Sequence, residues 1–386
     1  MIIFVFYIGN EHVPTVQVTA NVESNDSLIK TSDQAVKNEN TFTIKDPPKG
    51  KKIILEIPAP SLANNMIEEP VRQNISIYLP KFYDNGDKKY PVVYYLPGWR
   101  GSYDGTGDMF KYQMDILINK GISKEMIIVC INGTNKLFGS YYVNSIVTGN
   151  WEDFIVKDVV SYIDANYRTI EDARARGISG NSMGGFGCLS IAMHYPDVFS
   201  SVCSMSPELF DQNGVSAATN IRPSFLEIKE YENMTREEAH RAYMQDIPKF
   251  LYLRSSYAYD FYMSLGYASA FVPDPYSNAP YIKSLSGDTA MDQKIMEEWD
   301  NGLGGWDEKV NIYKNNLKKL KAITMEYGTN DEYSWASKGC IYLSGLLQKN
   351  NINHKLVIFK GKHEDLELQR IRDFLIPFFS DQLMFE

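Results

Sequence analysis

The sequence lacks an excess of positive charge. Its 386 residues include 39 Lys and Arg against 48 Asp and Glu, which gives a formal net charge of −9 at pH 7. Proteins that bind a nucleic-acid backbone do so mainly by neutralising phosphates with Lys and Arg. The charge balance therefore argues against nucleic acid as a partner and favours a neutral or uncharged substrate.

Cysteine is also scarce. The four cysteines are far apart, form no CxxC pair and have no histidine at metal-ligand spacing, which argues against a structural zinc and against a disulfide framework. Cys130, Cys188 and Cys203 lie within apolar runs, so we expect them to be small buried residues rather than redox centres.

No long hydrophobic run opens the chain. The start, MIIFVFYI, is too short to span a membrane and lacks the basic region and the clear cleavage site of a signal peptide. It is either a clipped signal or a first strand. The chain then turns polar as far as about residue 52, so we assign residues 1–52 to an apolar start and a linker. This composition favours export over a cytoplasmic location.

The rest of the chain is rich in apolar residues, which alternate between strand and helix patterns. Hydrophobic residues make up 44% of the sequence, enough for a large core. The strand patterns are KIILEI, NISIYLP, PVVYYLPG, MIIVCING, RARGIS, SSVCSMSP, KAITMEYG and HKLVIFKG. The helical patterns are MFKYQMDILINKG, WEDFIVKDVVSYIDANY, SMGGFGCLSIAMHY, GCIYLSGLLQKN and LQRIRDFLIPFFSDQL. This order predicts an α/β fold with a mostly parallel central sheet and helices on both faces.

The alternation is interrupted once, by a long segment rich in aromatic residues. We therefore predict a core in two parts, residues 53–207 and 319–386, with an insertion at 208–318 between two core strands. Aromatic rings there could form a substrate wall, but we expect most of them to pack the insertion onto the core.

One short stretch, GISGNSMGGFG at residues 177–187, has the pattern of a catalytic turn. Side chains at Gly180 and Gly184 would collide with neighbouring backbone in a sharp strand-to-helix turn, so the two glycines allow Ser182 to project its hydroxyl above the sheet edge. The alternative is an ordinary Gly/Ser-rich loop. The following helix would point free N–H groups at negative charge that develops beside the hydroxyl.

A serine nucleophile needs a general base and a carboxylate that orients the base. Of the five histidines, His363 lies in a loop after a strand, where such a base belongs. Asp331 lies in the loop after the preceding strand, with Glu332 as its rival, and the order Ser, acid, His fits an α/β-hydrolase. An oxyanion hole would take one backbone N–H from Met183 and another from Trp99, beside Gly98.

These motifs resemble the putative-esterase family of α/β-hydrolases, which contains esterase D, feruloyl esterases and mycolyltransferases. The resemblance runs through ISIYLPKFYDNGDKKYPVVYYLPG, DFIVKDVVSYIDANYR, GISGNSMGGFGCLSIAMHYPDVFSSVCSMSP, EYGTND and KGKHEDL. It implies the α/β-hydrolase fold, with Ser182 as nucleophile, Asp331 as acid and His363 as base, and with Met183 and Trp99 as the oxyanion donors.

The sequence departs from the family at two places. Many members have His-Gly where this chain has Pro97 and Gly98, and the segment at 208–318 is longer than in compact members, as expected of a cap over the serine. The resemblance implies a serine esterase that needs no cofactor and no metal, acting on acetyl or feruloyl esters of plant polysaccharide. The alternatives are an acyltransferase, a thioester hydrolase of the S-formylglutathione type, and an inactive carbohydrate-binding protein.

Overall fold

The computed structural model describes residues 7–8, 49–226, 231–250 and 256–386. Its centre is a nine-stranded sheet in the order β1-β11-β10-β9-β8-β4-β5-β3-β2. The strands are β1 (Tyr7–Ile8), β2 (Lys51–Pro58), β3 (Arg72–Leu79), β4 (Val92–Leu96), β5 (Ile127–Ile131), β8 (Arg176–Asn181), β9 (Ser201–Met205), β10 (Ala322–Gly328) and β11 (Lys355–Phe359). Within this nine-stranded sheet only the β2–β3 and β3–β5 pairs are antiparallel, so the prediction of a mostly parallel sheet is confirmed.

Four of the strands, β3, β4, β5 and β9, contribute side chains to two cores, one on each face of the sheet. In β4, Val92, Tyr94 and Leu96 belong to the first core, whereas Val93 and Tyr95 belong to the second. This is the two-residue repeat of a strand that is covered on both faces. It explains why these strands read as continuous apolar runs.

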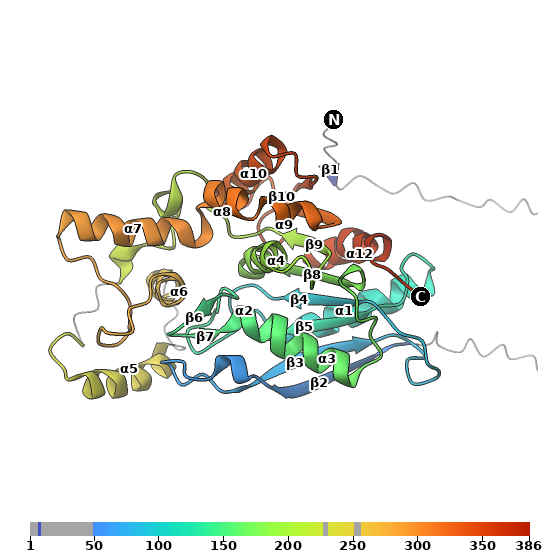
Figure 1. Ribbon diagram of the computed structural model, residues 1–386, viewed down its shortest axis with the longest axis horizontal. Helices are drawn as coiled ribbons and strands as arrows, with labels where there is room; N and C mark the ends of the chain where they lie inside the picture. The colour runs from blue at the N-terminus through green and yellow to red at the C-terminus, as the bar shows by residue number, and fades with distance from the viewer. Residues whose placement is uncertain (1–6, 9–48, 227–230, 251–255) are drawn as a thin grey trace, which may run out of the picture.

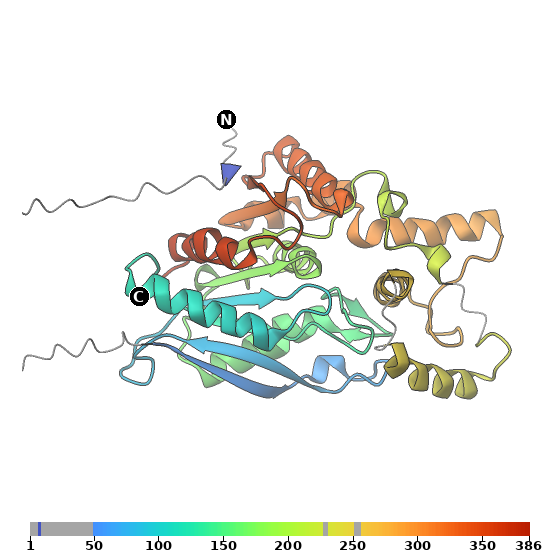
Figure 2. The same cartoon turned by 180° about the vertical axis from the view of Figure 1, so that it is seen from behind.

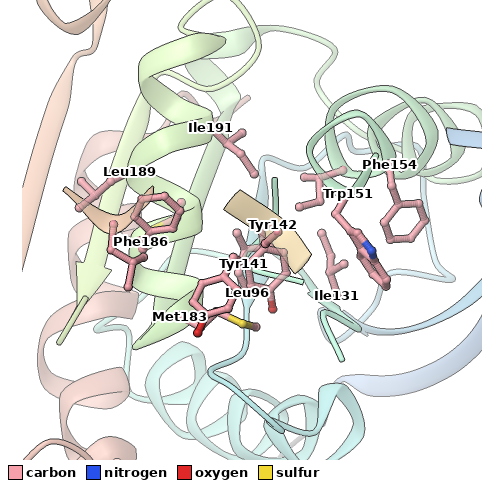
Figure 3. Packing of buried hydrophobic residues seen from close by; sticks show 14 of the residues in the cluster. Leu96, Ile131, Tyr141, Tyr142, Trp151, Phe154, Met183, Phe186, Leu189 and Ile191 are labelled. Atoms are coloured by element: carbon pink, nitrogen blue, oxygen red, sulfur yellow. The ribbon is translucent and has the colours of Figure 1, made fainter. Parts of the chain in front are cut away.

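Helices cover both faces, as the alternating pattern predicts. The first core lies beneath α2 (Trp151–Asp153), α3 (Val160–Asn166), α4 (Met183–His194) and α10 (Ser334–Lys349). Figure 3 shows Phe186 and Leu189 of α4 and Trp151 of α2 in this core. The second core lies beneath α1 (Tyr103–Asn119) and α12 (Ile376–Gln382), which are in front in Figure 2. The short helix α11 (Glu367–Arg370) precedes Ile371 and Leu375, which also belong to this core.

Three helical segments differ from their sequence patterns. The helix expected from Met109 begins earlier, at Tyr103, because the Ser102 side chain accepts a hydrogen bond from the Gly105 N–H and caps the first turn. The pattern at 151–167 and the one at 368–383 each contain a π-helical stretch, η2 (Phe154–Val159) and η6 (Ile371–Leu375). Short 3₁₀ turns, η1 (Pro60–Leu62) and η3 (Ala173–Ala175), and a small hairpin, β6 (Asn144–Ser145) with β7 (Gly149–Asn150), complete this part.

Between β9 and β10 the chain leaves the sheet and forms a largely helical layer at one end of it (Figure 1). This layer contains η4 (Gly214–Ala217), η5 (Pro223–Phe225), α5 (Arg236–Phe250), α6 (Ser256–Phe271), α7 (Thr289–Leu303), α8 (Trp306–Ile312) and α9 (Lys314–Lys319). The domain limits given above, with an insertion at 208–318, stay a prediction.

The apolar start contributes only β1, which pairs in parallel with the edge strand β11. The predicted linker falls almost entirely at 9–48, outside the described residues. All four cysteines are buried, as expected for the three in apolar runs, and burial raises the pKa of each thiol. Among the described residues, no helix is long and apolar enough to cross a membrane.

Candidate active site

Ser182 occupies the sharp turn between β8 and α4. Its backbone has φ 56° and ψ −118°, a conformation that a residue with a side chain rarely adopts. A Cβ atom at Gly184 would overlap the Leu96 carbonyl at the end of β4, and one at Gly180 would overlap the Gly184 carbonyl. The requirement for glycine on both sides of Ser182 is therefore confirmed.

Ser182, His363 and Asp331 form one chain of hydrogen bonds. Ser182 Oγ lies 2.8 Å from His363 Nε2, and His363 Nδ1 lies 2.8 Å from Asp331 Oδ2. All three residues are buried, with His363 only 2% exposed. They follow β8, β11 and β10, and these parallel strands end at the same edge of the sheet. The structure thus brings together three residues that are far apart in sequence.

Glu332, the rival acid, binds a different atom of His363. Its Oε2 accepts a hydrogen bond of 3.1 Å from the His363 backbone N–H. Asp331 is oriented by its own neighbour, because Oδ1 accepts a hydrogen bond of 2.9 Å from the Tyr333 N–H while Oδ2 faces the imidazole. Hydrogen bonds from the backbone lower the pKa of Glu332 although partial burial opposes them.

A buried arginine lies beneath this site. Arg370 Nε donates to Glu326 Oε1 over 2.7 Å, one Nη donates to the His363 carbonyl over 3.2 Å, and the other donates to Ser206 Oγ over 3.0 Å. Arg370 therefore ties the loop that carries His363 to β10 and to the loop after β9. Because the ion pair is fully buried, loss of either partner would leave an uncompensated charge.

The loop after β4 lies directly against the serine. A Cβ at Gly98 would be 3.3 Å from the Ser182 Cβ, and the Tyr142 hydroxyl donates a 2.7 Å hydrogen bond to the Pro97 carbonyl, which fixes the loop. The Trp99 ring packs edge-on against Tyr259, with the ring centroids 4.8 Å apart. Met183 is the first residue of α4, where backbone N–H groups have no partner within the helix.

Sequence reasoning missed Glu208. Its Oε1 lies 3.0 Å from Ser182 Oγ, its backbone N–H donates to the Ser182 carbonyl over 3.2 Å, and it is only 3% exposed. Burial raises its pKa to about 7. The signal was the acidic residue in SMSPELF after β9. Because β9 pairs with β8 in parallel, with Met205 opposite Asn181, the residues after β9 must lie beside Ser182.

The other histidines in the described part of the chain contact polar groups outside the Ser182 site. His194 Nδ1 lies 2.8 Å from Glu152 Oε2, His240 Nδ1 lies 2.7 Å from the Tyr281 hydroxyl, and His354 Nε2 lies 2.7 Å from Ser344 Oγ. His12 lies outside the described residues. Across the ranges that the structure describes, no cluster of three or more His, Cys, Asp or Glu could hold a metal ion.

The aromatic residues of the insertion mostly pack, as expected. Tyr267 stacks on Trp299 with 5.1 Å between the ring centroids, and Phe186 of α4 contacts both Phe271 and Trp306 edge-on. Tyr276, by contrast, is 91% exposed. Tyr252 lies outside the described residues.

Comparison with known proteins shows that this chain is similar to esterases. The family described as "Putative esterase" matches residues 69–366, well over half of the chain. An esterase of Mycobacterium tuberculosis (strain ATCC 25618 / H37Rv) is 34% identical over 135 residues, 34% of this chain and 28% of that protein. A diacylglycerol acyltransferase/mycolyltransferase of Mycobacterium leprae (strain TN) is 25% identical over 167 residues, 42% of this chain and 45% of the relative. The chain thus spans less than half the length of these curated relatives.

Among solved structures, a ferulic acid esterase superposes with a TM-score of 0.55 at 18% identity, covering 86% of this chain and 98% of that one. At this identity the likeness shows the fold alone, which is that of an α/β-hydrolase. Taken with the match over residues 69–366, the resemblance seen in the sequence motifs is confirmed, and the chain belongs to the putative-esterase family of α/β-hydrolases.

Proposed function

We propose that the protein is a serine carboxylic-ester hydrolase that works through an acyl-enzyme. The observation that carries this proposal is the hydrogen-bonded chain from Ser182 through His363 to Asp331. A hydroxyl, an imidazole and a carboxylate in this order form the arrangement that activates a serine as a nucleophile.

In the proposed reaction, Ser182 Oγ attacks the ester carbonyl while its proton passes to His363 Nε2. Asp331 accepts the Nδ1–H, which holds the imidazole in the tautomer whose Nε2 can take the proton. His363 then gives the proton to the departing alcohol. Water repeats the sequence on the acyl-enzyme, and Ser182 recovers its proton from His363 as the acid leaves.

The developing oxyanion would be held by two backbone N–H groups, those of Met183 and Trp99. The position of Met183 at the start of α4 supports the first assignment, and the closeness of Gly98 to Ser182 supports the second. Neither donor requires a cofactor.

For the substrate, we favour acetyl or feruloyl esters of plant polysaccharide. The fold shared with a ferulic acid esterase supports an aromatic or small acyl group. So does Tyr259, whose ring contacts Trp99 and whose hydroxyl lies 3.4 Å from that of Tyr333, a residue that packs edge-on against His363. Transfer to an alcohol instead of water is the second candidate, because one relative is named as an acyltransferase. Product analysis with sugar or alcohol acceptors present would separate the two, since a hydrolase releases only the free acid.

Hydrolysis of p-nitrophenyl esters, from acetate to decanoate, and of methyl ferulate tests the mechanism. Ser182→Ala and His363→Ala should each lower kcat by a factor of about 10⁴ or more. Ser344→Ala is the matched control, because Ser344 also binds a histidine, His354, but lies outside the site. If Ser182→Ala keeps the parent rate, or the parent cleaves none of these esters, the proposed function is wrong.

A further inference from the structure

The Ser182 hydroxyl has two neighbours that can each accept its single proton. His363 Nε2 lies 2.8 Å away and Glu208 Oε1 lies 3.0 Å away. When the His363 ring carries its proton on Nδ1, facing Asp331, Nε2 can only accept, so Ser182 must donate to it. The contact between Glu208 and Oγ is then a hydrogen bond only if Glu208 is protonated and donates. If Glu208 is ionised, it competes with His363 for the serine proton.

The surroundings of Glu208 favour its neutral form. The titratable groups that face it are Asp331 and His363 from the loops after β10 and β11, and four phenols. The phenols are Tyr141, Tyr259, Tyr267 and Tyr333, and burial raises the pKa of each. The phenols are therefore neutral, and no Lys or Arg is among these neighbours. Burial is the main cause that raises the pKa of Glu208 and Asp331 adds to it, whereas His363 and the hydrogen bond with Ser182 oppose it without cancelling it.

The second oxygen of Glu208 gives an independent indication. Oε2 is buried and, within the part of the chain that the structure describes, accepts no hydrogen bond. A buried carboxylate normally has several hydrogen bonds to offset its lost hydration, whereas a neutral carboxyl needs fewer. The position of the side chain is nevertheless fixed, because the Glu208 N–H binds the Ser182 carbonyl and Ser206, two residues earlier, is bound by Arg370.

We propose that Glu208 is a further catalytic residue and that its protonated form is the active one: the neutral carboxyl donates to Ser182 Oγ and leaves the serine proton to His363. This inference rests on the proposed ester hydrolysis. During attack, the Oγ–C bond forms, the carbonyl π electrons move to oxygen, and the Ser182 proton moves to His363 Nε2. Glu208 keeps its own proton throughout, and its O–H stabilises Oγ again when the acyl-enzyme is cleaved.

The ionised form would act in the opposite way. A Glu208 carboxylate takes the hydrogen bond of the serine hydroxyl away from His363 and places a second negative charge beside the developing oxyanion. Since Glu208 has a pKa of about 7, the active form is lost as the pH rises through neutrality. We therefore expect kcat/KM of the parent enzyme to fall by up to about tenfold for each pH unit above 7.

The test compares pH profiles of kcat/KM for methyl ferulate or p-nitrophenyl acetate between pH 5 and 9. Glu208→Gln keeps the shape of the side chain and can donate to Ser182 Oγ at every pH, so its profile should lose the fall above pH 7. The ratio of its rate to the parent rate should rise at least about tenfold from pH 6 to pH 9. Glu69→Gln is the control, because Glu69 is another buried glutamate of raised pKa, hydrogen-bonded to Gln73, that does not contact Ser182.

Identical profiles for the parent and Glu208→Gln would overturn the inference, as would a parent rate that does not fall up to pH 9. Should Glu208→Gln fail to fold, the rate at which a fluorophosphonate labels Ser182 of the parent gives the same information, and labelling that stays undiminished at pH 9 contradicts the role of Glu208. Ser182→Ala is measured alongside. If Ser182→Ala is inactive but the pH profile of Glu208→Gln equals that of the parent, only the inference about Glu208 is refuted. If Ser182→Ala is active, the proposed function itself is refuted.

Discussion

At the scale of single residues, two adjacent acids, Asp331 and Glu332, contact different atoms of the same histidine, His363. Asp331 faces the imidazole Nδ1, whereas Glu332 accepts from the His363 backbone N–H. The first contact controls the tautomer of the ring and the second controls the position of the loop. Only the first is needed in each proton transfer of the proposed reaction.

Replacement of each acid by its amide should separate these two roles. Asp331→Asn can present an N–H to Nδ1 and so stabilise the wrong tautomer, and we expect kcat to fall by a factor of about 10⁴. Glu332→Gln keeps an oxygen for the backbone N–H, and we expect a loss of no more than about tenfold. Steady-state kinetics with p-nitrophenyl acetate measure both. A loss in Glu332→Gln equal to that in Asp331→Asn would show that Glu332 is the orienting acid.

The sequence was sufficient to select Ser182, His363 and Asp331 as residues that the structure brings into contact, because the strand, turn and loop around each are local patterns. Their catalytic roles stay a prediction. It was not sufficient to find Glu208. That residue meets Ser182 only because β9 is hydrogen-bonded to β8, and the order of strands in a sheet is a long-range property. The engagement of His194 with Glu152 likewise joins segments that no local pattern connects.

At the scale of elements, the turn from β8 to α4 depends on how closely α4 approaches β4. The Leu96 carbonyl occupies the space that a side chain on Gly184 would need. Helix α4 is buried along almost its whole length, and its apolar side chains belong to the first core, so it cannot move away without opening that core. The strained backbone of Ser182 is held by this packing.

Gly184→Ala should therefore destabilise the protein, by about 3 kcal/mol in urea unfolding, since the added methyl group forces α4 and β4 apart. Gly345→Ala is the matched control. Gly345 lies inside α10, and a Cβ there would meet no atom within 4 Å. Because alanine favours a helix over glycine, this control should gain about 0.5 to 1 kcal/mol. Equal stability of the two variants would contradict the close approach of α4 to β4.

Element types were predictable from hydrophobic periodicity, but their ends and internal irregularities were not. The start of α1 at Tyr103 is set by the Ser102 side chain, outside the apolar pattern that indicated the helix. The π-helical stretch at Phe154–Val159 cannot be recognised from that apolar pattern either, because Ile155, Val159 and Ile163 are still buried on one side of the helix.

At the scale of the whole molecule, the layer between β9 and β10 shares its core with the sheet. Trp299 and Trp306 of this layer belong to the same buried cluster as Trp151 of α2 and Ile178 of β8. The Phe210 N–H also donates to the Leu303 carbonyl over 3.0 Å, joining the start of the layer to the end of α7. Such continuity is expected of a layer that folds together with the sheet rather than as a separate unit.

Unfolding should accordingly be a single cooperative transition for the layer and for the sheet. Incorporation of 5-fluorotryptophan gives each tryptophan its own ¹⁹F resonance, and single Trp→Phe variants assign the signals without truncating the chain. In a urea titration of the parent, the native signals of Trp299, Trp306 and Trp151 should all disappear at the same urea concentration. The reason is that exposure of one side of the shared core removes apolar contacts from the other side. Earlier loss of the Trp299 and Trp306 signals would show that the layer opens independently of the sheet.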